Sequence, residues 1–307
     1  MRLFLKNLTI ALGVLATILI ALELPIFFNR MNPNSVHTDW YDLIDCKAES
    51  VFIGNSRAWT TIDPERFYQC TGHTMQIIAQ DGWNSAILVE KTNYFRRVMK
   101  SEPKYVFIQL DPSMLFTRDN WYNKQHFLKY LLWDQVGIQS FASELQGYKW
   151  WEFYIPTTRY FTYPEQYFKE AFGLYTPLSE KFTNTRKING YCAYQNTEEK
   201  LQRLPDKNIW ENGFEEDAFK PILKIAQSFP ESEIVFLFCP ISEPLQAVTD
   251  FKQFDSFSKK YGIPLFDLSG RKGFVDELMF DHTHVNLSGS IIATETLCQK
   301  LENFTHN

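Results

Sequence analysis

Two short segments at opposite ends of the chain carry residue types that could together perform serine chemistry. Residues 54–56 read Gly-Asn-Ser, and residues 281–288 read Asp-His-Thr-His-Val-Asn-Leu-Ser. A serine becomes a nucleophile when an imidazole takes its proton and an acid orients that imidazole, and these groups can come from distant parts of a chain. The spacing Asp281-x-x-His284 lets one short loop supply both acid and base. We therefore expect Ser56 to be the nucleophile, His284 the base and Asp281 the orienting carboxylate.

Ser56 follows an apolar run rich in β-branched and aromatic side chains, residues 51–53 (Val-Phe-Ile), and then Gly54. This order predicts a strand that leaves its sheet through the glycine into a loop or a helix start. The backbone N–H of Ser56 would then lie beside its own hydroxyl, in the electropositive environment of a helix N-terminus. We expect this N–H to stabilise the negative charge that develops on an ester carbonyl during attack.

The order of the two segments resembles the SGNH, or GDSL-like, hydrolase superfamily, whose first block carries the nucleophilic serine after the first strand and whose last block reads Asp-x-x-His. The first block is matched at residues 54–56, with Asn55 where many members have Asp, and the last at Asp281 and His284, with Gly289 following. The chain looks most like the membrane-anchored branch, which includes the alginate acetylation proteins and the protein acting in lipoteichoic acid D-alanylation. The resemblance covers two segments, roughly residues 45–115 and 215–300.

The middle blocks of the superfamily are matched in layout. Residues 77–85 have the strand-then-glycine order of the second block, so the resemblance makes the N–H of Gly82 the second expected oxyanion donor. The third block normally supplies an asparagine after a strand, whereas here residues 106–110 lead into Asp111. Asn84, in the preceding loop, is then the candidate for the side-chain donor of the oxyanion hole.

Each motif also has an ordinary structural interpretation. Gly-x-Ser after a strand is common turn chemistry, and a helix start attracts Asp and Ser as caps. With six histidines in the chain, one Asp-x-x-His pair can arise by chance. The ordered combination at the ends of predicted strands favours catalysis by Ser56 and His284. We expect His282 to be a neighbour that faces solvent or substrate.

An apolar stretch near the N-terminus predicts a membrane anchor. Residues 8–28, apart from one glutamate near the end, are predominantly apolar and reach the ~20 residues that a bilayer span requires. Arg2 and Lys6 precede the stretch, so the positive-inside rule leaves the N-terminus in the cytoplasm and exports the remainder. The alternative is a cleaved signal peptide, but no small-x-small cleavage site followed by a polar mature start is evident. We expect an uncleaved single-pass anchor over residues 1–30 and one extracytoplasmic domain over residues 31–307.

Composition fits an exported globular domain. The chain is 45% hydrophobic and 22% charged, near globular averages, and its net charge of −5 at pH 7 offers no basic patch for nucleic acid. The cysteines have no CxxC or Cys/His ligand spacing, so we expect no metal site and no other cofactor. In an oxidising compartment one pair such as Cys46 with Cys70 could form a disulfide, although the sequence does not assign partners and the odd count leaves at least one free thiol.

Strand-like and helix-like patterns alternate along most of the chain. Five apolar runs bounded by Gly, Pro or Asp predict strands at residues 51–53, 75–79, 105–110, 234–239 and 264–268. Helical spacing lies between or after them, at residues 86–99, 218–229, 251–261 and 288–301. This alternation predicts a three-layer α/β/α domain with a mostly parallel five-stranded sheet, as in the SGNH and flavodoxin-like folds. Sites in such sheets lie at the carboxyl ends of the strands.

The segment from about residue 113 to residue 214 departs from this alternation and is crowded with aromatic residues, among them Trp121, Tyr130, Trp133, Trp151 and Phe168. We expect a helical insertion that caps the cleft. Its rings can either stack on sugars or fill the centre of a small subdomain, and for most of them we favour the second role.

Together these features predict an extracytoplasmic serine esterase or O-acyltransferase that acts on acyl groups of a cell-envelope glycan. Attack by water on the acylated serine would make the protein an esterase, and attack by a sugar hydroxyl would make it a transferase. The alternative is a catalytically inactive protein of the same fold that binds glycan or assists an integral membrane acyltransferase. The expected partners are an acylated glycan or other ester substrate and the membrane.

Overall fold

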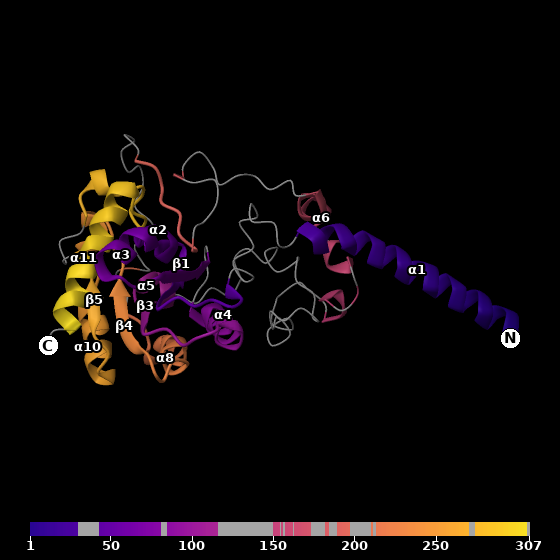
Figure 1. Ribbon diagram of the computed structural model, residues 1–307, viewed down its shortest axis with the longest axis horizontal. Helices are drawn as coiled ribbons and strands as arrows, with labels where there is room; N and C mark the ends of the chain where they lie inside the picture. The colour runs from indigo at the N-terminus through magenta and orange to yellow at the C-terminus, as the bar shows by residue number, and fades with distance from the viewer. Residues whose placement is uncertain are drawn as a thin grey trace. The chain divides into compact units, whose positions relative to one another are not determined.

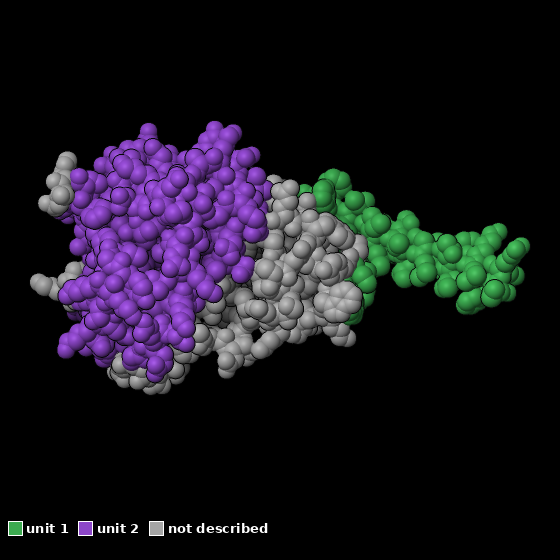
Figure 2. All heavy atoms as spheres, turned by 90° about the horizontal axis from the view of Figure 1, so that it is seen from below, with its two compact units in different colours: residues 1–41, 120–177 green, residues 42–119, 178–307 purple. Residues whose placement is uncertain are grey.

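The chain divides into two compact units, Met1–Tyr41 with Asn120–Pro177 and Asp42–Asp119 with Leu178–Asn307 (Figure 2). We call them unit 1 and unit 2. The computed structural model describes residues 1–29, 43–80, 85–115, 150–153, 155, 157–161, 163–172, 182–183, 189–196, 210, 213–269 and 274–305.

Unit 2 is built on a parallel sheet of five strands in the order β2-β1-β3-β4-β5, of which Figure 1 labels β1, β3, β4 and β5. The strands are β1 (Ser50–Asn55), β2 (Met75–Gln80), β3 (Tyr105–Gln109), β4 (Glu233–Phe238) and β5 (Leu265–Asp267). Each coincides with a predicted strand to within two residues at either end. The expected α/β architecture with a mostly parallel five-stranded sheet is therefore confirmed.

Helices cover both faces of this sheet, which explains why its strands are continuous apolar runs rather than alternating ones. On one face, Phe52 and Phe107 share a core with Phe67 of α3 (Pro64–Thr71) and Leu297 of α11 (Leu287–Thr305). The adjacent residues of each strand point to the opposite face. There the sheet meets α4 (Ser85–Val98), α8 (Lys220–Gln227) and α10 (Phe251–Tyr261). All four predicted helical segments are present.

The strand order reverses beside β1. The chain runs from β1 to β2 on one side and then returns to β3 on the other, so β1 pairs with both. In open parallel sheets, ligands bind at the carboxyl ends of the strands where the order reverses. This edge follows Asn55 of β1 and Gln109 of β3, and it is where Ser56 lies.

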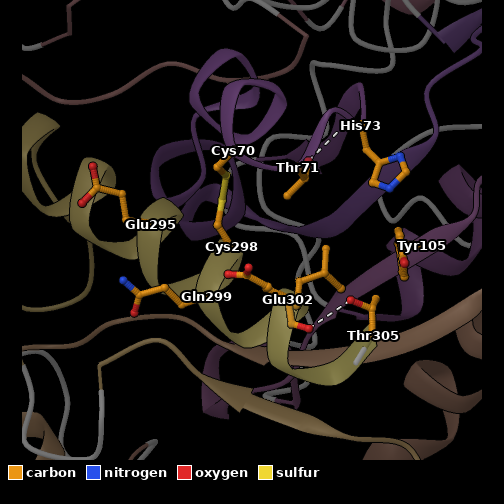
Figure 3. A pocket seen from close by; sticks show the side chains of 10 residues that line it. Cys70, Thr71, His73, Tyr105, Glu295, Cys298, Gln299, Glu302 and Thr305 are labelled. Carbon is orange, nitrogen blue, oxygen red and sulfur yellow. Dashed lines mark hydrogen bonds between the residues drawn. A yellow bond between two sulfur atoms is a disulfide. The ribbon is translucent and has the colours of Figure 1, made fainter. Parts of the chain in front are cut away.

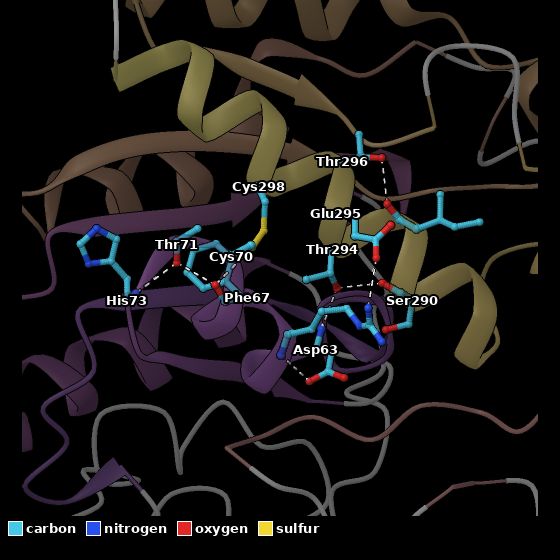
Figure 4. The surroundings of a disulfide bond; sticks show 12 residues. Asp63, Phe67, Cys70, Thr71, His73, Ser290, Thr294, Glu295, Thr296 and Cys298 are labelled. Carbon is cyan, nitrogen blue, oxygen red and sulfur yellow. Dashed lines mark hydrogen bonds and ion pairs between the residues drawn. A yellow bond between two sulfur atoms is a disulfide. The ribbon is translucent and has the colours of Figure 1, made fainter.

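A disulfide between Cys70 and Cys298 joins α3 to α11 across 228 positions of sequence, with the two Cα atoms 6.2 Å apart (Figure 4). The pairing of Cys46 with Cys70 that the sequence suggested is wrong, because Cys46 carries a free thiol. An exposed ion pair between Arg66 and Glu295 joins the same two helices.

A pocket of about 430 Å³ opens beside the disulfide (Figure 3). Its lining includes Cys70, His73, Tyr105, Glu295, Cys298 and Glu302. Tyr105 is the first residue of β3, so this pocket lies towards the amino ends of the strands. It is therefore separate from the edge of the sheet that carries Ser56.

Unit 1 contains the N-terminal helix α1 (Arg2–Asn29), two short 3-10 turns, η4 (Trp150–Phe153) and η5 (Thr158–Tyr160), and α6 (Pro164–Phe172). By length and composition α1 could cross a membrane, a test that a signal sequence also passes. Of the expected insertion, residues 120–177 group with α1, whereas residues 178–214 belong to unit 2. Trp121, Tyr130 and Trp133 lie outside the described residues, and so does most of the expected cap.

Candidate active site

Ser56 is the first residue of a six-residue helix, α2 (Ser56–Thr61), which begins directly after β1. Gly54 is required at the end of β1 because a Cβ atom there would lie 2.3 Å from Oε1 of Gln109 and 2.6 Å from Cβ of Ala58. The strand can therefore approach β3 closely before the chain turns into the helix. Ser56 remains half-buried, with its hydroxyl at the carboxyl edge of the sheet.

Asn55 holds this turn in place through both ends of its amide. Its Oδ1 accepts the backbone N–H of Arg57 (3.1 Å) and so caps α2, while its Nδ2 donates to Oγ of Ser113 (2.8 Å). Gln109 at the end of β3 bonds Asn55 twice, accepting its backbone N–H (3.0 Å) and donating to its Oδ1 (3.1 Å). The residue before Ser56 thus ties the ends of β1 and β3 together.

The structure brings Ser56, His284 and Asp281 together from positions 228 residues apart. Oγ of Ser56 lies 2.9 Å from Nε2 of His284, and Nδ1 of His284 lies 2.9 Å from Oδ2 of Asp281. An ionised carboxylate can only accept, so Nδ1 of His284 carries a proton and Nε2 is left to accept the proton of the Ser56 hydroxyl. This is the order of contacts that a nucleophile, a base and an orienting acid require.

Asp281 is held in its ionised form. Burial alone would raise its pKa, but the charge of His284 and hydrogen bonds from His284 and Thr283 together lower the pKa of this carboxyl well below its usual range. Its Oδ1 accepts the backbone N–H groups of Thr283 (2.7 Å) and His284 (2.8 Å) and the hydroxyl of Thr283 (2.9 Å). The carboxylate therefore shapes the loop and also orients the imidazole.

The loop around His284 is closed at both ends. Met279 and Val285 form an antiparallel bridge, and the backbone N–H of Phe280 donates to the carbonyl of His284 (2.8 Å). Asn286 then begins α11, because its Oδ1 accepts the backbone N–H of Gly289 (3.0 Å) while its Nδ2 donates to the carbonyl of Glu277 (2.8 Å). The position of the imidazole is thus fixed by the start of α11.

Arg57, which no sequence pattern indicated as important, joins the parts of the site. Its side chain is 2% exposed and forms an ion pair with Asp111, which is fully buried after β3. Its Nη2 donates to the carbonyls of Cys239 (2.7 Å) and Pro240 (2.9 Å), which follow β4. Its Nε donates to the carbonyl of Thr283 (2.8 Å), beside His284. One guanidinium therefore connects the helix that carries Ser56 to the loop that carries its base.

The expectation that His282 faces solvent or substrate is wrong. This side chain is 9% exposed, and its Nδ1 lies 2.8 Å from Oγ of the buried Ser242. The backbone N–H of Ser242 also donates to the carbonyl of His282 (3.1 Å). Alternate residues of the loop point in different directions, so His284 reaches Ser56 while His282 anchors the loop to the segment after β4.

The expected oxyanion donors are only partly within the described residues. The N–H of Ser56 lies in the first turn of α2, where backbone N–H groups have no partner within the helix. Gly82 and Asn84 lie outside the described residues. Asp111 lies at the position of the third block. Its carboxylate accepts hydrogen bonds from the side chains of Arg57 and Gln109 and from the backbone N–H of Ser113, so it holds these residues in place and does not donate to a substrate.

Three stacked aromatic rings stand beside the imidazole, and sequence reasoning did not single them out. Tyr194 stacks on Phe280 with ring centroids 3.8 Å apart and on Phe182 with centroids 4.4 Å apart. The edge of Tyr194 faces the ring of His284, with centroids 5.6 Å apart. The stack forms an apolar wall next to the base. The only sequence signal for this stack was the abundance of aromatic residues between about residues 113 and 214, which include Phe182 and Tyr194.

No group of three or more potential metal-ligating side chains occurs in the described part of the chain.

Comparisons with known proteins give similarity at the level of structure only. Neither a scan against protein-family models nor a search of curated proteins found a match. Among solved structures, the chain is similar to a GDSL-like lipase from Bacteroides thetaiotaomicron VPI-5482, with 12% identity over 90% of this chain and 99% of the other and a TM-score of 0.40. It is also similar to an acetyl xylan esterase from the rumen bacterium Butyrivibrio proteoclasticus, with 10% identity over 84% of this chain and 64% of the other and a TM-score of 0.34. At these values the function has to be argued from the residues of this chain.

Proposed function

We propose that the protein is a serine hydrolase or acyltransferase of the SGNH type that acts on carboxylic esters. One observation carries the proposal: the continuous hydrogen-bonded series from Oγ of Ser56 through the imidazole of His284 to the carboxylate of Asp281. A half-buried serine hydroxyl directed at an imidazole that is itself held by an ionised acid is the arrangement of an activated nucleophile.

In the first half of the reaction, Oγ of Ser56 attacks the ester carbonyl carbon while Nε2 of His284 takes the hydroxyl proton. The charge on the carbonyl oxygen is stabilised by the N–H of Ser56 and, in this proposal, by Gly82 and Asn84. When the tetrahedral intermediate collapses, the bond to the leaving alcohol breaks and His284 returns the proton to that alcohol. Asp281 stabilises the imidazolium between these steps. The product is an acyl ester on Ser56.

In the second half, a hydroxyl group attacks the carbonyl carbon of the acyl ester on Ser56 and gives its proton to His284. The bond between that carbon and Oγ of Ser56 then breaks, and His284 returns the proton to Oγ. Water as the attacking group yields a free acid, and a sugar hydroxyl yields a new ester. The aromatic stack beside His284 provides an apolar surface next to the imidazole, which fits the C–H groups of an acyl chain or of a sugar ring. We propose an acylated cell-envelope glycan as substrate.

The proposed location is the outer face of a cell membrane, with α1 as an uncleaved anchor. The disulfide between Cys70 and Cys298 supports this location, because disulfides persist in oxidising compartments. An integral membrane acyltransferase is then a suitable partner if the acyl group reaches Ser56 from another protein.

Covalent labelling with a fluorophosphonate tests the proposal directly, because this reagent phosphonylates activated serines. We expect the full-length protein to be labelled and the Ser56→Ala variant to lose the label. Ser242→Ala is the matched control, since Ser242 also lies 2.8 Å from a histidine nitrogen but is fully buried, and no carboxylate bonds its histidine among the described residues. We expect Ser242→Ala to keep the label.

The same variants separate catalysis from glycan binding alone. Absence of labelling in the folded wild-type protein, together with no turnover of a small acetyl ester, would reject the enzyme in favour of an inactive glycan-binding partner of an acyltransferase. Equal labelling of wild type and Ser56→Ala would place the reactive serine elsewhere.

A further inference from the structure

Most of α1 is not covered by the part of the chain that the structure describes. From Leu3 to Leu22 nearly every side chain is exposed, and Glu23 and Ile26 are the first buried ones. Twenty residues at about 1.5 Å per residue make a helix of about 30 Å, which is the thickness of the hydrocarbon core of a bilayer. The uncovered part of α1 is therefore as long as a membrane span, and the covered part begins where that span ends.

Two hydrogen bonds lie at the end of the exposed part of α1, at Leu22 and Glu23. The carboxylate of Glu23 accepts the backbone N–H of Thr157 (2.9 Å), and the hydroxyl of Tyr167 donates to the carbonyl of Leu22 (2.9 Å). Thr157 precedes η5 and Tyr167 lies in α6, which packs against α1. Backbone polar groups outside helices do not face lipid tails, so this level of α1 belongs to the interface between tails and head groups. These contacts place α6 at that level.

α6 carries an apolar surface that the described residues do not cover. Ala171 is buried and Tyr167 is partly buried, but Phe168 and Phe172 are 55% and 64% exposed and stack on each other with centroids 6.2 Å apart. Phe161, just before the helix, is 70% exposed. Lys169 is also exposed and lies three residues before Phe172, on the neighbouring part of the helix surface. A short amphipathic helix with exposed aromatic rings is the kind of element that lies in a membrane interface.

We propose that Phe161, Phe168 and Phe172 insert into the interface of the lipid bilayer at the level where α1 leaves it, so that α6 lies in the plane of the membrane. The inference rests on the proposed anchoring by α1 and goes beyond it, because it gives unit 1 a second membrane contact that α1 alone does not supply. The occupant of the surface is lipid. Lipid is the expected occupant because the hydroxyl of Tyr167 bonds α6 to the end of the exposed apolar part of α1, which is as long as a membrane span.

Depth-dependent fluorescence quenching tests this with the full chain in nanodiscs that hold one protein each. Single cysteines are introduced as Phe168→Cys or Phe172→Cys in a Cys46→Ser background, since Cys192 and Cys239 are buried and Cys70 and Cys298 are paired. Each is labelled with the fluorophore NBD, and the lipids carry a nitroxide near the head-group end of their tails. We expect a several-fold larger loss of emission at positions 168 and 172 than at Tyr68→Cys, which places the same probe at an exposed position of unit 2.

Two reference positions separate the failure of this inference from failure of the anchor. Ile18→Cys reports on the middle of α1, and Tyr68→Cys reports on an exposed position of unit 2. If the Ile18 probe is quenched by a nitroxide deep in the tails while the probes at 168 and 172 are quenched no more than the probe at 68, the interfacial role of α6 is rejected and the anchor stands. If the Ile18 probe is not quenched, the anchor and the role of α6 are rejected together. Protection of positions 168 and 172 from an aqueous quencher without lipid quenching would assign the surface to protein contacts and also overturn the proposal.

Discussion

His282 and His284 are chemically identical side chains two residues apart, and their surroundings give them different roles. His284 lies between Ser56 and an ionised carboxylate, whereas His282 bonds a buried serine hydroxyl. In the proposed mechanism, only the first imidazole can pass a proton between a substrate and the hydroxyl of Ser56. The difference comes from the direction in which each side chain leaves the loop.

The first prediction concerns these two histidines. We expect Ser56→Ala and His284→Ala each to lower kcat for an acetyl ester on the order of 10³-fold or more, because a triad acts as a unit. Asp281→Asn should have an intermediate effect. His282→Ala should keep most of the kcat of folded protein but lose about 1–3 kcal/mol of unfolding free energy, because it leaves a buried hydroxyl unpaired.

Kinetics on samples whose folding is verified by circular dichroism provide the measurement. If His282→Ala lost its activity while His284→Ala stayed active, the base would be His282 and not His284. If all four variants kept wild-type activity, the proposed mechanism with Ser56 as the nucleophile would be rejected.

The second prediction concerns the pH dependence of stability at Asp281. The pKa of this carboxyl is lowered in the folded protein, so its ionised form stabilises the fold above the unfolded pKa of about 3.9, and that contribution is lost as the pH falls through the folded pKa. We expect wild type to exceed Asp281→Asn in unfolding free energy at neutral pH and the gap to narrow steadily below about pH 4.

Urea denaturation of both proteins across pH 2 to 8 measures this gap. Asp276→Asn is the control, since the carboxyl of Asp276 lies in the exposed turn η7 (Asp276–Leu278). A gap between wild type and Asp281→Asn that stays constant with pH would show that the carboxylate charge does not contribute to folding.

At the scale of elements, the site depends on how the ends of β1, β3 and β4 are joined. Arg57 connects these strand ends, because its guanidinium donates hydrogen bonds to Asp111, Cys239 and Thr283, which lie in three separate segments. The ring of Trp210 lies 5.4 Å from its guanidinium carbon. A buried guanidinium with several oxygen partners fixes directions as well as distances, because its donors are planar and rigid.

The third prediction is that Arg57→Ala lowers the free energy of unfolding by about 3–5 kcal/mol, because it leaves the carboxylate of Asp111 buried without its partner. Arg66→Ala is the matched control: its ion pair with Glu295 is exposed, and its loss should cost about 0–1 kcal/mol. Chemical denaturation gives both values. If the two losses are equal, Arg57 does not have the structural role assigned to it.

A milder variant tests the positioning role of Arg57 apart from stability. Arg57→Lys keeps the charge but cannot reach four oxygens in one plane, so we expect it to lower kcat more than it raises KM for the acetyl ester. Equal changes in both parameters, or none, would mean that Arg57 does not position the loop of His284.

The sequence was sufficient to predict the five strands, because runs such as residues 105–110 are apolar throughout and end at turn residues. The long helices followed from their spacing. The short helix α2 was not predicted as a helix of defined length, because six residues are too few to show a period. Pairing of the first and last segments was also predictable, since the edge of a parallel sheet collects the ends of its strands.

The rest of the site depends on contacts that have no local signal. A single arginine after a serine looks like a surface residue, and only the folded chain brings Arg57 next to Asp111. The direction of His282 depends on the turn made by Asp281 and not on residue type. The partner of Cys70 lies 228 positions away, and five cysteines allow many pairings.

At the scale of the whole molecule, two independent features concern the compartment. One is the N-terminal helix α1, in which Arg2 and Lys6 precede the long apolar stretch, an order that favours export of everything after it. The other is the disulfide between α3 and α11, which needs an oxidising environment to persist. Neither depends on the other, because one lies in unit 1 and the other in unit 2. The proposed location outside the cytoplasm would account for both.

The fourth prediction is that a C-terminal fusion to alkaline phosphatase is active and sediments with membranes, because that enzyme folds only after export and α1 remains attached. In the same cells, we expect Cys70 and Cys298 to resist alkylation until a reductant is added, while Cys46 reacts without one. Replacing Arg2 and Lys6 by glutamate should weaken the export signal and lower both the phosphatase activity and the fraction of oxidised Cys70.

An active fusion recovered in a soluble fraction would identify α1 as a cleaved signal, since the fusion would be exported but not anchored. An inactive fusion with Cys70 and Cys298 reduced would reverse the orientation and place unit 2 in the cytoplasm.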